Sequence, residues 1–141
     1  MITEDYVSFE TAKLLKEKGI EYDQNESYWL IDADNKMYWV SRIGAYDYVD
    51  NPTDSFQRPK NGYRLVTQAV AMKWLRENFN INPVPYALSL GWAFDIFDLS
   101  NKDITGCKKL FSMDLPSKSE CYNTYEEACE AAIKYCLENL V

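Results

Sequence analysis

The sequence predicts one globular α+β domain, residues 1–141, whose elements follow the order helix, hairpin, helix, hairpin, helix. Three segments repeat apolar residues at helical spacing, and two pairs of aromatic and β-branched runs are separated by short polar turns. In addition, 47% of the residues are hydrophobic, including eleven Tyr, six Phe and four Trp, which suits a packed core. We therefore expect both hairpins to form one antiparallel sheet of about four strands, with the three helices packed on one of its faces.

The first helix and the first hairpin are predicted at residues 8–18 and 28–43. In SFETAKLLKEKG, Ser8 is suited to cap the helix and Gly19 to end it. YWLIDA and MYWVSRI are strand-like runs on either side of a short polar turn. The acids of DADNK begin like a calcium-binding loop, but the run lacks the glycine and the closing Glu of such a loop. A hairpin turn is therefore the preferred interpretation.

Residues 44–64 are interpreted as a long loop, with two short strands joined by a loop as the alternative. This stretch contains two prolines and an Asn-Gly pair and shows no sustained periodicity. A second helix is predicted at residues 67–79, because Thr67 can cap it and apolar residues recur on one face. NINPVP should end it, since Pro83 cannot continue a helix.

The second hairpin is predicted at residues 91–114 and the last helix at residues 124–140, where TYEE has the spacing of a capping box. The octapeptides AMKWLREN and AIKYCLEN lie in the second and third helices. WLID and WAFD begin the two hairpins at nearly the same separation. These two matches suggest an internal ββα duplication, although amphipathic helices commonly use the same residues.

The composition argues against several kinds of chemistry. The chain has no His, which excludes Ser-His and Cys-His nucleophile pairs and every His-containing zinc site. It also lacks a phosphate-binding glycine run and a CxxC motif. We therefore expect no cofactor and no metal, and we assign no catalytic residue. The four cysteines are interpreted as small apolar residues of a reducing compartment, with a disulfide between Cys107 and Cys121 as the alternative.

The start of the chain lacks a basic segment followed by an apolar run, and no stretch has the length of apolar residues that spans a bilayer. These features predict a cytoplasmic protein without membrane contact.

Two neighbouring segments carry the candidate binding residues. Between Ser55 and Arg76 the chain has five basic residues and no acidic one, although its net charge is −7. Such a basic segment can meet an anionic ligand or an acidic partner, or it can pair with the acidic last helix. Duplex nucleic acid is not expected, because the acidic remainder would repel it. Aromatic residues before and within this segment suit protein recognition, or fold back on the core. The candidate residues are Tyr46, Tyr48, Phe56, Arg58, Lys60, Tyr63, Arg64 and Arg76.

Three helical stretches carry a resemblance to a known family. SFETAKLLKEKG, QAVAMKWLREN and TYEEACEAAIKYCLENLV resemble small uncharacterised proteins encoded by gut Bacteroidales, their phages and their mobile elements. The resemblance covers about a third of the chain, and it implies a bacterial cytoplasm and carriage on a mobile element but no site residue.

The function expected from these observations is that of a non-enzymatic protein-interaction module of bacterial, phage or mobile-element origin. It would use the loop of residues 44–64 or an exposed sheet face, and the same face could also support a homodimer. The alternative is a protein that binds or hydrolyses a small anionic ligand with the basic segment of residues 55–76.

Overall fold

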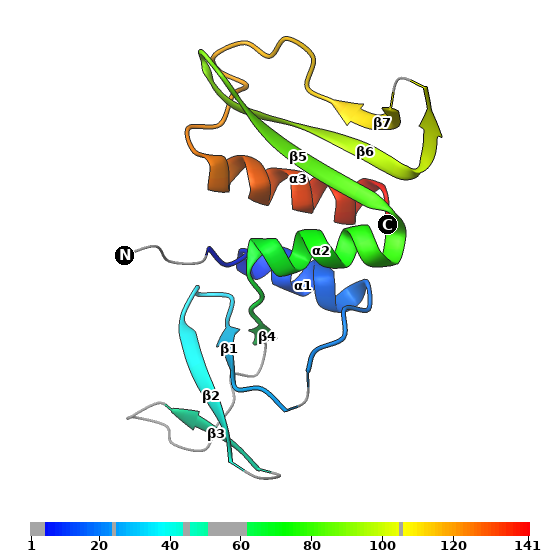
Figure 1. The fold of residues 1–141 in the computed structure, drawn as a ribbon. Coiled ribbons are helices and arrows are strands. Elements are labelled where there is room, and N and C mark those ends of the chain that lie inside the picture. The colour runs from blue at the N-terminus through cyan, green and yellow to red at the C-terminus, as the bar shows by residue number, and fades with distance from the viewer. Residues whose placement is uncertain (1–4, 24, 44–45, 51–61, 105) are drawn as a thin grey trace. The chain divides into compact units, whose positions relative to one another are not determined.

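The computed structural model describes residues 5–23, 25–43, 46–50, 62–104 and 106–141. Within it the chain forms two compact units, each packed mainly on itself. The N-terminal unit is Tyr6–Val66, and the C-terminal unit is Thr67–Val141 together with Met1–Asp5. Each unit is described by itself (Figure 1). The expectation of a single domain stays a prediction.

The N-terminal unit contains one helix and a small antiparallel sheet. Strands pair in the order β3-β2-β1, and the two-residue strand β4 adds to the other side of β1. Leu30 and Val40 form its buried cluster, with Tyr28 and Tyr38 packed against them. The elements are α1 (Phe9–Glu17), β1 (Tyr28–Ile31), β2 (Met37–Ile43), β3 (Tyr46–Asp50) and β4 (Tyr63–Arg64).

Local sequence features explain the first helix and the first hairpin. The Ser8 side chain accepts a hydrogen bond from the Thr11 amide at 3.2 Å, and Gly19 follows the helix with a φ of 93°, as expected at a helix end. In the hairpin, a carboxylate oxygen of Asp32 accepts hydrogen bonds from the amides of Asp34 and Lys36 at 3.0 and 2.9 Å. The predicted turn is confirmed, because these bonds use the carboxylate to close the loop.

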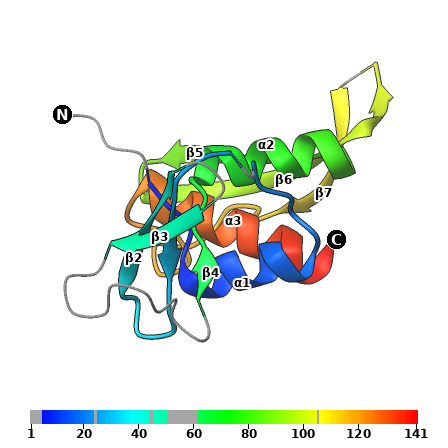
Figure 2. The same cartoon turned by 90° about the horizontal axis from the view of Figure 1, so that it is seen from below.

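The C-terminal unit is a three-stranded antiparallel sheet in the order β5-β6-β7 with two helices against it. The helices contact each other and β5, and α3 also contacts β6, as both views show (Figure 1 and Figure 2). The buried side chains Leu75, Ile96, Ile133 and Leu137 form the core between them. The elements are α2 (Gln68–Phe79), β5 (Ile81–Leu88), β6 (Gly91–Asp103), β7 (Gly106–Ser112) and α3 (Tyr125–Asn139).

The α+β class, the three helices and both hairpins are confirmed, but the prediction of one sheet is wrong. The strands form two sheets, and α1 belongs to the N-terminal unit, where it contacts β4. The error comes from NINPVP, which forms most of β5. Proline ends a helix but is tolerated on an edge strand. Since β5 pairs with β6 and β4 with β1, the two hairpins do not join.

The prediction of a continuous loop over residues 44–64 is also wrong in part. Tyr46–Asp50 is strand β3 and pairs with β2, while Tyr63–Arg64 is strand β4 and pairs with β1. The two short strands of the alternative are therefore present. Residues 44, 45 and 51–61 of this stretch, including the segment between the two strands, lie outside the described residues.

The two octapeptides form the same local structure. Asn78 donates to the carbonyl of Trp74 at 3.0 Å, and Asn139 donates to the carbonyl of Tyr135 at 3.1 Å. Each helix also has an i,i+4 ion pair between its Lys and its Glu. Both helices lie in the C-terminal unit, whereas the first hairpin lies in the other unit. The two predicted ββα segments are therefore not equivalent packed units, and duplication stays a prediction.

Candidate aromatic binding groove

A groove of about 330 Å³ lies between α3 and the β6–β7 side of the sheet. Phe94 and Phe111 come from neighbouring strands, and Tyr135 comes from α3, so the groove is walled by both layers of the C-terminal unit. We call it the aromatic groove. Its lining residues are Phe94, Phe111, Met113, Tyr122, Ala131, Lys134, Tyr135 and Glu138.

The aromatic side chains of the groove contact one another. The ring centroids of Phe111 and Tyr135 are 4.2 Å apart, and those of Phe94 and Phe111 are 5.3 Å apart. The ring centroids of Phe94 and Tyr122 are 6.1 Å apart. Phe94 is 4% exposed, whereas Phe111, Tyr122 and Tyr135 are half-buried. A buried ring thus supports three partly exposed ones, which offer apolar surface to a ligand.

The groove has a charged rim. Lys134 and Glu138 line it and pair with each other at 3.9 Å. Among the residues that the structure describes, no group of His, Cys, Asp or Glu could hold a metal ion. The groove is therefore suited to bind an apolar or aromatic group, with polar contacts only at its margin.

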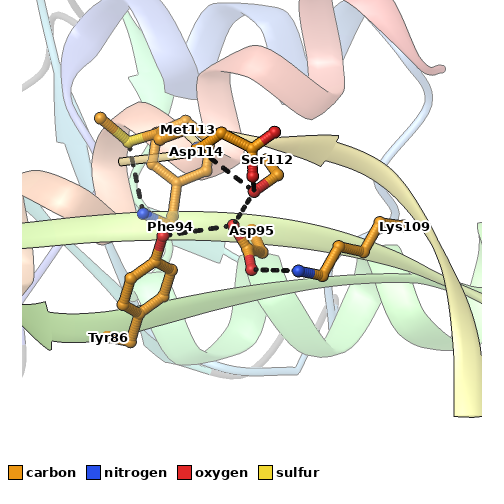
Figure 3. Close-up of polar contacts among 7 residues, drawn as sticks. All are labelled: Tyr86, Phe94, Asp95, Lys109, Ser112, Met113 and Asp114. Carbon is orange, nitrogen blue, oxygen red and sulfur yellow. Dashed lines mark hydrogen bonds and ion pairs between the residues drawn. The ribbon is translucent and has the colours of Figure 1, made fainter. Parts of the chain in front are cut away.

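A polar cluster joins all three strands of the same sheet (Figure 3). Asp95 of β6 accepts hydrogen bonds from Ser112 of β7 at 2.8 Å and from Tyr86 of β5 at 3.4 Å. Its second oxygen lies 3.3 Å from the ammonium group of Lys109. The hydroxyl oxygen of Ser112 also lies 3.0 Å from a carboxylate oxygen of Asp114. Burial, and then the negative charge of Asp95, raise the pKa of Tyr86.

The geometry of this cluster indicates a structural role. The Asp95 side chain is 13% exposed, and its two oxygens face three donors from β5 and β7. A carboxylate engaged by three donors is a poor general base. Asp95 instead fixes the alignment of β7 on β6, and with it the position of Phe111 in the groove.

A second pocket of about 170 Å³ lies where α2 and α3 begin, lined in part by Asp5, Ala69 and Cys129. Gln68 closes one side, because its side-chain amide donates to the carbonyl of Glu126 at 2.9 Å. Burial raises the pKa of Cys129, so its thiol is a weak nucleophile. All four cysteines are free, and the alternative of a disulfide between Cys107 and Cys121 is wrong in this structure.

The residues predicted from the sequence do not form this groove. The Arg64 guanidinium lies over the rings of Tyr22 and Tyr28, at 4.8 and 4.3 Å from their centroids, and donates to the carbonyl of Asp23 at 3.0 Å. Tyr63 packs on Phe9 with centroids 5.5 Å apart. Arg64 and Tyr63 therefore hold β4 in the N-terminal unit.

The other predicted residues are dispersed or not described. Arg76 lies in α2 of the C-terminal unit. Tyr46 and Tyr48 lie in β3, of which the structure describes the backbone. Phe56, Arg58 and Lys60 lie outside the described residues. Of the predicted residues whose side chains the structure describes, it brings together only Tyr63 and Arg64, as neighbours in β4.

Sequence reasoning missed the groove because its residues come from three distant segments. One usable signal was present: Phe94, Phe111 and Tyr135 each fall on the apolar side of a predicted element. That pattern does not show which apolar residues remain partly exposed, because exposure depends on how far α3 covers the sheet.

Comparison with known proteins gives no relative: no family model, no curated protein and no solved structure matches the chain. Across the described ranges, none of the helices combines the length and the hydrophobicity that a bilayer crossing requires.

Proposed function

We propose that the protein is a non-enzymatic interaction module that binds a segment of a partner protein in the aromatic groove. The observation that carries the proposal is the row of half-buried rings, Phe111, Tyr122 and Tyr135, supported by the buried ring of Phe94. Rigid aromatic side chains contribute large contact area at low entropic cost and dominate many protein interfaces. The charged pair of Lys134 and Glu138 at the margin resembles the polar rim of such interfaces.

The size of the groove is compatible with a protein partner. Its volume of about 330 Å³ is at the lower end of the range of about 300–1,000 Å³ that small-molecule sites occupy. A groove of this size suits one or two large apolar side chains of a partner. The bacterial or mobile-element origin and the cytoplasmic location implied by the resemblance stay predictions.

The alternative of a small anionic ligand has less support. Of its basic residues, Arg64 is engaged by two rings and a carbonyl within the N-terminal unit. Arg76 lies on a helix of the other unit. Because Arg64 is already engaged within its own unit, the protein-interaction function is preferred.

The test is to select, from a displayed library of random peptides, those that bind the full chain, and then to measure the affinities of the enriched peptides. Ala131→Leu adds three carbons inside the groove on a helix that tolerates Leu. We expect it to weaken the enriched peptides at least about tenfold, which corresponds to about 1.4 kcal/mol. Ala69→Leu is the matched control, because it adds the same atoms to the smaller pocket.

Two results would overturn the proposal. One is a selection that enriches no peptide on the wild-type chain. The other is a set of enriched peptides that bind Ala131→Leu and wild type equally while near-ultraviolet circular dichroism shows the same fold for both. Loss of binding on Ala69→Leu alone would move the site to the smaller pocket.

A further inference from the structure

We infer that the partner segment binds as an extended strand added to the outer edge of β7, with apolar side chains in the aromatic groove and acidic side chains beside Lys109. This inference rests on the proposed function and specifies its binding mode. Addition of a strand to a sheet edge is a common form of peptide recognition, in which main-chain hydrogen bonds give affinity and pockets for alternate side chains give specificity.

The two edges of the sheet differ in what they offer to a further strand. The order β5-β6-β7 leaves β5 and β7 at the edges, and no described strand pairs with the outer side of β7. On β5, Pro83 and Pro85 have no amide hydrogen. In β7, GCKKLFS contains no proline. Of these two edges, β7 is therefore the one on which no proline removes an amide donor from an added strand.

The backbone groups of β7 that face outward can be assigned from the hydrogen bonds of β6. Trp92 exchanges two hydrogen bonds of 2.8 Å with Tyr122 on the β7 side of β6. Hydrogen-bonded and non-hydrogen-bonded positions alternate along an antiparallel strand. Asp95 and Phe97 therefore occupy non-hydrogen-bonded positions toward β7, and their partners Ser112 and Lys109 direct their amides and carbonyls away from β6.

The groove lies beneath this edge. Phe111 pairs with Ile96 and lines the groove, whereas Ser112 and Lys109 contact Asp95 on the other face. A register shift at Leu110 places Lys109 and Ser112 on the same face. Because successive side chains of a strand point to opposite faces, an added strand would direct every second side chain toward the groove and the others toward Lys109.

Charge decides between a partner segment and a second copy of the chain. The strand β7 carries Lys108 and Lys109 and no acidic residue. Lysine on an edge strand opposes pairing with a copy of itself, because like charges come close across the ladder. Lys109 is paired with Asp95 but remains 53% exposed, so an added acidic side chain can approach it. An acidic, alternating partner segment is therefore the complementary occupant.

The probe is an acetylated and amidated peptide Glu-Val-Glu-Phe-Glu-Val-Glu, whose length matches the seven residues of β7. It is titrated into the ¹⁵N-labelled full chain, and amide exchange is measured with and without it. We expect binding, slower exchange of the Lys109 and Ser112 amides, and no change at Ala87, whose amide faces the outer side of β5. Replacing Glu by Lys in the peptide should weaken binding at least about tenfold. Replacing both Val by Pro should abolish it.

The outcomes separate this inference from the proposed function. Binding that Ala131→Leu weakens, without slower exchange at Lys109 and Ser112, overturns strand addition and leaves the groove as a binding site. If the peptide shows no binding up to about 1 mM while the displayed selection still enriches peptides that bind the groove, strand addition is overturned and the proposed function stands. A stable dimer in light scattering, with slow exchange of the Lys109 and Ser112 amides in the free protein, overturns the choice of a partner segment in favour of a second copy.

Discussion

The rings of Phe111 and Tyr135 lie with their centroids 4.2 Å apart and join the edge strand β7 to the helix α3. Phe94 stacks behind Phe111. This contact is where the sheet and the helix meet at the aromatic groove, so the same rings contribute to the stability of the C-terminal unit and to the surface that we assign to binding.

We expect Tyr135→Ala to lower the free energy of unfolding by about 1–3 kcal/mol, because it removes the ring contacts and part of the buried apolar area. Tyr135→Phe keeps the ring and should stay within about 0.5 kcal/mol of wild type. Urea denaturation followed by Trp fluorescence measures both variants. Equal destabilisation by the two variants would show that the hydroxyl, not the ring, matters at this position.

Removal of the Ser112 hydroxyl tests the structural role of the polar cluster. Ser112→Ala leaves Asp95, whose side chain is 13% exposed, without its shortest hydrogen bond, and should cost about 1–2 kcal/mol. Ser100→Ala is the matched control, because Ser100 donates to Asp98 at 2.6 Å in an exposed hydrogen bond, and its loss should destabilise the chain less than loss of the Ser112 hydroxyl. Similar denaturation midpoints for both variants would contradict the role given to Asp95.

The buried thiols should differ from the partly exposed ones in reactivity. Burial raises the pKa of Cys136 to about 12, so its thiol stays protonated at pH 8, whereas Cys107 and Cys121 are half-buried. Iodoacetamide at pH 8 followed by peptide mass spectrometry should modify Cys107 and Cys121 first, and Cys129 and Cys136 only after denaturation. Early modification of Cys136 in the native chain would contradict its placement in the core.

The same thiol makes stability depend on alkaline pH. The ordinary pKa of the Cys136 thiol is 9.0, and the folded value is about 12. The unfolded chain thus loses this proton more readily, and the contribution of Cys136 is fully present below pH 9 and is lost as the pH rises toward 12. Cys136→Val should show a smaller decrease in denaturation midpoint between pH 8.5 and 10.5 than wild type. If the denaturation midpoints of Cys136→Val and wild type decreased equally, Cys136 would not be the source of the alkaline pH dependence.

Arg64 should act through its planar guanidinium and not through its charge alone. It lies over Tyr22 and Tyr28 and bonds the carbonyl of Asp23. Arg64→Lys keeps the charge but loses the stacking geometry, so we expect a loss of about 0.5–2 kcal/mol in stability. Lys13→Arg, on an exposed position of α1, is the control and should have no effect. A stable Arg64→Lys chain with weaker nucleotide binding would instead favour the anionic-ligand alternative.

Much of the local structure follows from the sequence because the signals are local. Ser8, Thr67 and Thr124 cap the three helices as their spacing predicts, and Asp32 closes the first hairpin by bonds within five residues. Apolar periodicity placed the buried faces of α2 and α3 in part: Leu75, Ala132 and Cys136 are buried, whereas Phe79 and Tyr125 of the same apolar stripes are exposed.

By itself, the sequence determined the helices and the two hairpins, because caps and turns act over a few residues. Its composition determined the absence of histidine chemistry. Only the tertiary structure decided that NINPVP forms β5, that the hairpins belong to separate sheets, and that β7 ends the second sheet beside a groove. Strand partners and residual exposure depend on contacts between distant segments. Phe94, Phe111 and Tyr135 become one surface only when β6, β7 and α3 meet.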